Sequence, residues 1–408
     1  MKTNSKEYHQ LSHIETILGK FNNTKDVSKN YPDVTNTIPM HQFMSNYFNN
    51  HRFLGSRDRR AIRQGVYSYL RLGNILINRN FNERLSIGLF LCSLENSELL
   101  NYLSETNLWL KNANPSTPLE EKLGVVKNIF PDFNLFDLCH CLPFISEKIN
   151  KQEWALSMFN PPHVWIRLRN GFETFVKNEL AQALFVFEEN PAFPQSLSFP
   201  PQTPLQNLES FRKGWFEIQD ISSQRIFENI KIPENCHVWD CCCGSGGKSL
   251  LLLDKFPTIH LFCSDVRDTM LFNLKERLNK AGHKQICTTN IDLTKPDLPD
   301  MLFDFILVDA PCSGSGTWAR TPEAMQSCNE NALEKFNLLQ STILKNLSSY
   351  LKPSGKLIYT TCSVFSVENE KLITQLENEK IYRKISDDYI SGVKTTSDTM
   401  YRALLERK

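Results

Sequence analysis

The stretch Asp240-Cys241-Cys242-Cys243-Gly244-Ser245-Gly246-Gly247-Lys248 joins the end of an apolar segment to the start of a helical pattern through three glycines. The glycines allow a tight turn and let the backbone approach a ligand without a side-chain clash. Their spacing differs from the Gly-x-Gly-x-x-Gly motif of dinucleotide-binding folds and from the phosphate-binding P-loop. We therefore expect a strand, turn and helix that bind a different nucleotide-like cofactor.

Around this turn, short apolar segments alternate with helical patterns, which is typical of a doubly wound α/β sheet. The predicted strands are residues 236–242, 260–265, 286–292, 304–309 and 356–362. Between the last two, apolar residues recur at helical spacing and predict a helix that covers one face of the sheet. The predicted fold class is α/β, with this domain over residues 214–408.

Two further regions precede the sheet domain. Residues 1–152 are predicted to be mainly helical, with Ser56 as the cap of one helix and Gly73 at its end. Residues 153–213 are predicted to form a small α/β subdomain, because residues 163–169 alternate apolar and polar side chains as a half-buried strand does. Five prolines between residues 190 and 204 predict a connector without a central strand.

The composition indicates a folded protein with two or three domains, since 41% of its 408 residues are hydrophobic. The polar start lacks a signal segment, and no apolar stretch approaches the ~20 residues that span a bilayer. We expect a soluble, cytosolic and monomeric protein without a metal site. The twelve cysteines are scattered without Cys-x-x-Cys spacing, so they are expected to be reduced, with the run 241–243 serving mainly as packing.

The net charge of +1 is uninformative, but its distribution is uneven. Residues 40–84 hold eight arginines, no lysine and two acidic residues, which gives a local formal charge of +6. Such a cluster predicts an RNA-binding surface, and an ordinary solvated helix is the alternative. The candidate RNA-binding residues are Arg57, Arg59, Arg60, Arg63, Arg167 and Arg320.

Aspartates stand at the predicted ends of three successive strands. These are Asp265, Asp292 and Asp309. Ligands of doubly wound sheets bind at the carboxyl ends of the strands, where a carboxylate accepts hydrogen bonds from ribose hydroxyls. Together the three side chains suit the ribose, adenine amino group and ammonium of S-adenosylmethionine, although a single strand-end aspartate often only caps a helix.

Cysteines follow the last two predicted strands, in Asp309-Ala310-Pro311-Cys312-Ser313 and in Thr360-Thr361-Cys362-Ser363. Two thiols that converge on one crevice indicate covalent catalysis. Carbon 5 of cytosine is too electron-poor to attack a methylsulfonium until a thiolate adds to carbon 6, so this pair predicts methyl transfer to carbon 5 of a cytosine. The alternative is two buried thiols without a chemical role.

Taken in order, these motifs and Glu368-Asn369-Glu370 resemble the RsmB/Sun branch of RNA cytosine-5 methyltransferases, over essentially residues 164–362. The resemblance implies a Rossmann-like domain, an upstream RRM-like subdomain and a NusB-like RNA-binding region. It implies that Cys362 is the nucleophile, that Cys312 promotes release, and that Asp309 also holds the target base. The implied S-adenosylmethionine contacts are Cys242, Cys243, Gly244, Ser245, Gly246, Gly247, Lys248, Asp265, Asp292 and Asp309.

The resemblance implies ribosomal RNA as the substrate, with tRNA as a second choice, and leaves the modified cytosine open. Cys243-Gly244-Ser245 stands where the family has Ala-Ala-Pro, and residues 399–403 replace its Gly-Phe-Phe-x-Ala. One rival is a DNA cytosine-5 methyltransferase, whose nucleophile follows a proline as Cys312 does. A second rival is a catalytically silent RNA-binding or ribosome-assembly protein.

Overall fold

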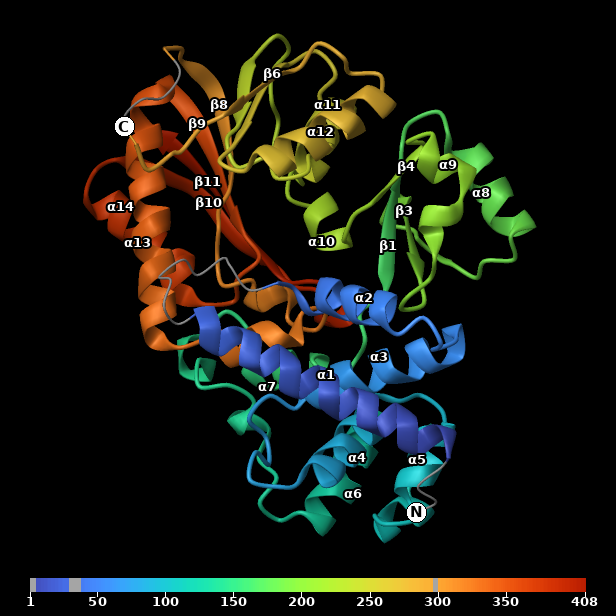
Figure 1. Ribbon diagram of the computed structural model, residues 1–408. Coiled ribbons are helices and arrows are strands. Elements are labelled where there is room, and N and C mark those ends of the chain that lie inside the picture. The colour runs from blue at the N-terminus through green and yellow to red at the C-terminus, as the bar shows by residue number, and fades with distance from the viewer. Residues whose placement is uncertain (1–4, 29–37, 296–299) are drawn as a thin grey trace. The chain divides into compact units, whose positions relative to one another are not determined.

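The computed structural model describes residues 5–28, 38–295 and 300–408 (Figure 1). The chain divides into two compact units. The helical unit comprises Met1–Pro143, Asn150–Pro161 and Trp318–Ala332, and the sheet unit comprises Phe144–Ile149, Pro162–Thr317 and Leu333–Lys408. The domain boundaries expected from the sequence, at residues 152 and 213, concern a finer division and stay a prediction.

The described part of the helical unit contains α-helices and short 3-10 helices. The α-helices are α1 (Lys6–Ser28), α2 (Met40–Asn50), α3 (Ser56–Arg71), α4 (Phe81–Cys92), α5 (Glu98–Leu103), α6 (Leu119–Ile129) and α7 (Lys151–Ser157). The predicted cap at Ser56 is wrong by one position, because Gly55 is the capping residue and Ser56 begins the helix. Gly73 follows the end of α3 with φ of +50°, as expected for a helix end.

The main sheet of the sheet unit has seven strands in the order β10-β11-β9-β8-β5-β6-β7. They are β5 (His237–Asp240), β6 (His260–Asp265), β7 (Cys287–Asn290), β8 (Phe303–Asp309), β9 (Leu351–Thr361), β10 (Tyr382–Ile390) and β11 (Met400–Arg407). The five predicted strands are all present and run parallel, and β11 and β10 add antiparallel pairs at one edge. The predicted α/β class is confirmed as a mixed sheet.

Helices cover both faces of this sheet (Figure 1). On one face lie α13 (Glu330–Leu347) and α14 (Glu370–Asn378), whose buried leucines and isoleucines join Trp239 and Tyr359 in one core. On the other lie α11 (Gly247–Lys255) and α12 (Asp268–Lys280), which share a second core with Val238. The strand order reverses between β5 and β8, so a ligand site is expected at the carboxyl ends of these strands.

A second, four-stranded antiparallel sheet has the order β2-β3-β1-β4. Its strands are β1 (Val164–Leu168), β2 (Glu188–Asn190), β3 (Phe193–Phe199) and β4 (Phe216–Ile218), accompanied by α8 (Glu173–Gln182) and α9 (Glu209–Arg212). The prediction that residues 190–204 contain no central strand is wrong, because β3 pairs with both β1 and β2. Pro194 is tolerated because pairing with β1 reaches only to Ser196, so its missing N–H is not needed there.

Candidate active site

The glycine-rich turn lies between β5 and α11, as predicted. Gly246 has φ of +89°, and a Cβ there would overlap the Leu274 side chain of α12. The positive φ therefore favours glycine, and a larger residue would also have to displace the end of the Leu274 side chain. The Cys243 N–H donates to the Ser264 carbonyl oxygen at 3.0 Å, while a Cβ on Gly244 would meet open space. This leaves room for a ligand beside Gly244.

Asp265 ends β6 and is 4% exposed. Its carboxylate accepts the Gly244 N–H at 2.9 Å and the Arg267 guanidinium at 3.0 and 3.2 Å. The hydrogen bond to Asp265 raises the pKa of Arg267, whose side chain is nevertheless 58% exposed. A ligand that hydrogen-bonds Asp265 would replace Arg267. Opening an ion pair with one exposed partner costs little free energy.

The other two aspartates have different surroundings. Asp292 does not end its strand as predicted, because β7 stops at Asn290. It accepts the Thr294 hydroxyl at 2.6 Å, and this bond lowers the pKa of Asp292. Asp309 is the last residue of β8 and accepts the Lys248 ammonium at 2.6 Å.

Lys248 lies at the start of α11, and its side chain is 13% exposed. Burial opposes its charge, but the charge of Asp309, the hydrogen bond to it and the Cys362 thiol in its ionised form each favour the ammonium and raise the pKa of Lys248 above its ordinary value. Lys248 is therefore an ammonium paired with Asp309. Sequence reasoning placed it in the cofactor segment but assigned it no further role.

The two candidate cysteines lie together. Asp309 of β8 is in register with Thr360 of β9, and the chain places Cys312 and Cys362 shortly after these positions. Their Sγ atoms are 3.4 Å apart. The hydrogen bond with Cys362, burial, and the charges of Cys362 and Glu368 raise the pKa of Cys312 well above its ordinary value.

The loops that carry these cysteines are tied by backbone hydrogen bonds. The Gly316 N–H donates to the Cys362 carbonyl oxygen at 2.8 Å, and the Thr399 N–H donates to the Gly316 carbonyl oxygen at 2.9 Å. A Cβ on Gly316 would overlap the Thr399 carbonyl oxygen, so this approach requires glycine. Buried Asn369 accepts the Thr361 hydroxyl at 2.6 Å and donates to the Ser363 carbonyl oxygen at 2.8 Å.

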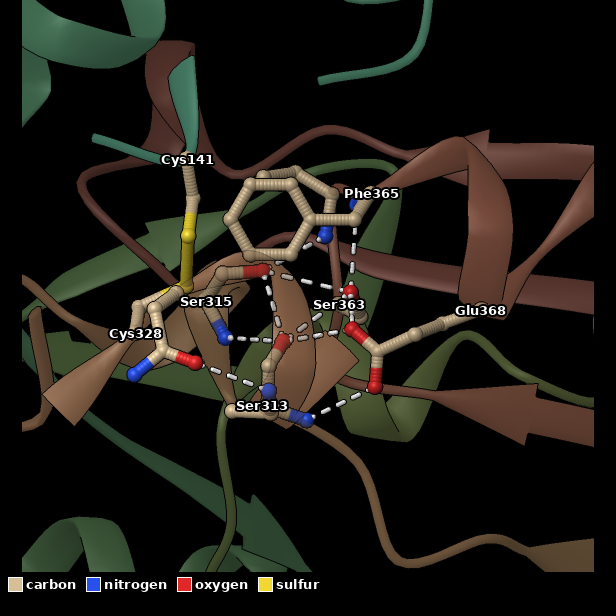
Figure 2. Close-up of a disulfide and its surroundings, with 10 residues drawn as sticks. Cys141, Ser313, Ser315, Cys328, Ser363, Phe365 and Glu368 are labelled. Carbon is tan, nitrogen blue, oxygen red and sulfur yellow. Dashed lines mark hydrogen bonds between the residues drawn. A yellow bond between two sulfur atoms is a disulfide. The ribbon is translucent and has the colours of Figure 1, made fainter. Parts of the chain in front are cut away.

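The remaining cysteines mostly pack. Cys241 and Cys243 are buried members of the two cores, which confirms the packing role expected for them, and Cys242 is half-buried. The expectation that all cysteines are reduced is wrong for one pair in the helical unit, where Cys141 and Cys328 form a disulfide (Figure 2). The two residues are 187 positions apart, so their pairing could not be inferred from spacing.

The arginine cluster of the helical unit is only partly available at the surface. Arg57 and Arg60 are exposed, and Arg59 and Arg63 lie half-buried over the Phe48 ring. By contrast, Arg71 and Arg84 are buried and donate to the carbonyl oxygens of Ala319 and Gly73. The local charge of +6 therefore overstates the charge offered to a ligand.

The two RNA-binding candidates outside the cluster differ from each other. Arg167 is 3% exposed, donates to Gln219 at 2.9 Å and pairs with Asp254 of α11. These contacts engage most of its guanidinium, and its assignment to RNA binding stays a prediction. Arg320 is half-buried in the helical unit.

Two features are absent from residues 5–28, 38–295 and 300–408. None of the helices there has the length and apolar character needed to cross a membrane. In the same ranges, histidine, cysteine and acidic side chains do not gather into a set that would hold a metal ion.

The geometry at the carboxyl ends of β5, β6, β8 and β9 can be compared with known proteins. Residues 229–403 match the family described as 16S rRNA methyltransferase RsmB/F. Over these residues the chain is similar to the RsmB/F family. Its relatives include ribosomal RNA small subunit methyltransferase B of Enterobacter sp. strain 638, which is 31% identical over 217 residues, or 52% of this chain and 50% of the relative.

The protein of the same name from Photorhabdus laumondii is 29% identical over 260 residues, or 61% of this chain and 58% of the relative. The chain thus spans about half the length of the curated RsmB relatives that it matches. Among solved structures, PH0851 has a TM-score of 0.70 at 18% identity and covers 90% of this chain and 95% of its own. NSun6 from Pyrococcus horikoshii with SFG has a TM-score of 0.56 at 15% identity, over 63% of this chain and 94% of its own. These structures show a shared fold.

Proposed function

We propose that this protein methylates carbon 5 of a cytosine in RNA, with S-adenosylmethionine as the methyl donor and ribosomal RNA as the substrate class. The observation that carries the proposal is the 3.4 Å contact between Cys312 and Cys362, beside the Lys248–Asp309 pair at the strand ends of the sheet. The match of residues 229–403 to the RsmB/F family supports the same reaction.

The residues present suit the methyl donor. The open space at Gly244, the buried carboxylate of Asp265 and the strand-end position of Asp309 offer backbone approach and acceptors for hydroxyl and ammonium groups. Residues 242–248, Asp265, Asp292 and Asp309 would hold S-adenosylmethionine, which supplies the methyl group. Displacement of Arg267 from Asp265 would accompany binding.

The proposed chemistry begins with Cys362. Its thiolate adds to carbon 6 of the cytosine, which makes carbon 5 nucleophilic toward the methyl group. A nearby ammonium stabilises a thiolate, and Lys248 is such a group. Asp309 would accept a hydrogen bond from the cytosine amino group and so orient the base.

Release of the product requires two changes. The proton on carbon 5 leaves to a base, and the electron pair of that C–H bond restores the double bond as the bond from carbon 6 to Sγ of Cys362 breaks. Cys312 would promote this step, and its contact with Cys362 supports that role.

The exposed arginines of the helical unit, Arg57 and Arg60 among them, would hold RNA phosphates. We further propose that the protein acts as a cytosolic monomer.

The test is bisulfite sequencing of purified ribosomal RNA, and separately of tRNA, incubated with the protein and S-adenosylmethionine. We expect at least one cytosine to become resistant to conversion with the parent protein and to stay convertible with Cys362→Ala. No new resistant cytosine in ribosomal RNA or tRNA would contradict the proposed reaction and favour a silent RNA-binding protein.

A further inference from the structure

A fully buried carboxylate, Glu368, lies directly behind the two cysteine loops. It ends the short helix η8 (Ser366–Glu368). Its Oε1 accepts the Ser313 N–H at 2.8 Å and the Gln340 side-chain N–H at 3.2 Å. Its Oε2 accepts the hydroxyls of Ser313, at 2.6 Å, and of Ser363. Figure 2 shows the side chains of Glu368, Ser313 and Ser363 pointing toward one another.

The donors come from two different loops of the proposed site. Ser313 follows Cys312 on the loop after β8, and Ser363 follows Cys362 on the loop after β9. A buried carboxylate is costly unless hydrogen bonds satisfy it. Burial raises the pKa of Glu368, and the bonds from Ser313 and Ser363 oppose this rise. The carboxylate and the loops therefore hold each other in place.

Other hydrogen bonds also join the two loops, because the Ser363 hydroxyl contacts the hydroxyls of Ser313 and Ser315 at 3.2 Å and the Val364 N–H donates to the Ser315 hydroxyl at 2.9 Å. Glu368 accepts from both Ser313 and Ser363 and so orients these hydroxyls. The contacts of Asn369 with Thr361 and Ser363 both lie on the β9 side, so they shape one loop. The Gly316 N–H reaches Cys362 from a point four residues beyond Cys312. Glu368, by comparison, contacts the residue directly after each cysteine.

We propose that Glu368 is a positioning residue that ties the Cys312 loop to the Cys362 loop and holds the two thiols in contact. The roles of the cysteines rest on the proposed function, whereas the contact between them does not. A glutamine at this position would keep the shape but lose the charge, and its amide nitrogen could bind the serine hydroxyls only as a donor, with both hydroxyls turned to accept. Such neutral bonds are weaker than those to a carboxylate. Glu368→Gln should therefore loosen the two loops relative to each other.

The direct test is the rate at which diamide oxidises Cys312 and Cys362 to a disulfide, in which the two thiols lose two hydrogens to the diazene. Peptide mass spectrometry distinguishes this bond from the Cys141–Cys328 bond. We expect the rate in Glu368→Gln to fall by about tenfold or more, since a tenfold change corresponds to ~1.4 kcal/mol in a barrier. An unchanged rate in a folded Glu368→Gln protein would overturn the proposal.

The matched control is Glu370→Gln, two positions along the chain. Its carboxylate contacts the hydroxyls of Ser146 and Tyr389 and neither cysteine loop, so the oxidation rate should match the parent. An equal fall in both variants would assign the effect to general loosening and overturn the proposal. If Glu368→Gln does not fold, Ser313→Ala removes one arm of the bridge and should slow oxidation by a smaller factor, and an unchanged rate there would overturn it instead.

Methylation kinetics give a second readout. With Glu368→Gln we expect kcat to fall by about tenfold while KM for RNA stays that of the parent, because the thiols rather than the RNA surface are displaced. A rise in KM alone would contradict the positioning role. If the parent protein methylates no RNA, the proposed function fails, but the oxidation rates still decide the role of Glu368.

Discussion

The Sγ atoms of Cys312 and Cys362 lie 3.4 Å apart although the residues are 50 positions apart in the chain. The pairing of β8 with β9 brings them to one edge of the sheet, and the loops after these strands complete the approach. Two thiols in contact can act in succession on one base, one by attack and the other during release.

Removal of the Asp265 carboxylate should weaken binding of S-adenosylmethionine. We expect Asp265→Ala to cost about 1–3 kcal/mol, since it removes hydrogen bonds to a charged group. Arg267→Ala is the control and should bind at least as tightly as the parent, because Arg267 occupies the same carboxylate. Titration calorimetry with the parent protein and both variants would measure the affinity for S-adenosylmethionine. Unchanged affinity in Asp265→Ala would remove Asp265 from the site.

Exposed arginines of α3 should set the salt dependence of RNA binding. In Arg57→Ala/Arg60→Ala we expect weaker binding and a log-affinity against log-salt slope reduced by about 0.7 for each lost phosphate contact. Fluorescence anisotropy at several salt concentrations measures the slope. Lys111→Ala/Lys127→Ala removes the same charge from exposed positions elsewhere in the helical unit and should leave the slope unchanged. Equal slopes in all three proteins would make α3 an ordinary solvated helix.

Asp240 should make stability depend on pH. It is fully buried, and burial raises its pKa from 3.8 to about 7. The folded state therefore favours the protonated carboxyl, which contributes to the free energy of unfolding. This contribution is fully present below the unfolded pKa and is lost as pH rises through 7. The loss amounts to about 1.4 kcal/mol for each unit of pKa shift.

Asp240→Asn should remove this dependence, because an amide oxygen can still accept the Ser249 hydroxyl bond. Urea unfolding at pH 5 and pH 8 would measure the difference. The parent should lose more stability than the variant over this interval. Parallel losses would show that Asp240 does not titrate as described.

Loss of the Lys248 ammonium should reduce the reactivity of Cys362. In Lys248→Met the stem remains but the charge near the thiol and Asp309 is gone, so we expect slower alkylation of Cys362 by iodoacetamide at pH 7. Mass spectrometry of the labelled peptide gives the rate. The exposed Lys127→Met is the control and should react as the parent does. Faster or equal labelling in Lys248→Met would contradict the role given to Lys248.

Much of the sheet could be predicted because β5, β6, β8 and β9 are apolar runs that end in polar residues at the site. The antiparallel strands β10 and β11 lie beyond the last motif and were not predicted. Strand β3 was not predicted because the segment around it is rich in proline. Its Pro194 lies outside the pairing with β1.

Single side chains were harder to predict than elements. The strand-end position of Cys312 and Cys362 indicated their convergence, since parallel strands end at one edge. Burial of Arg167 with Asp254, the Cys141–Cys328 disulfide and the bridge made by Glu368 depend on tertiary contacts between distant segments. Local sequence carries no signal for such contacts beyond residue type.

The roles of the two cysteines are tested most directly by covalent trapping with RNA. The measurement is the amount of protein–RNA complex that survives a denaturing gel after incubation with RNA and S-adenosylmethionine. We predict no complex and no methylation for Cys362→Ala, and accumulated complex for Cys312→Ala, because attack proceeds but release is impaired. Complex with Cys362→Ala and none with Cys312→Ala would contradict the account and assign the attack to Cys312, as in a DNA-type mechanism.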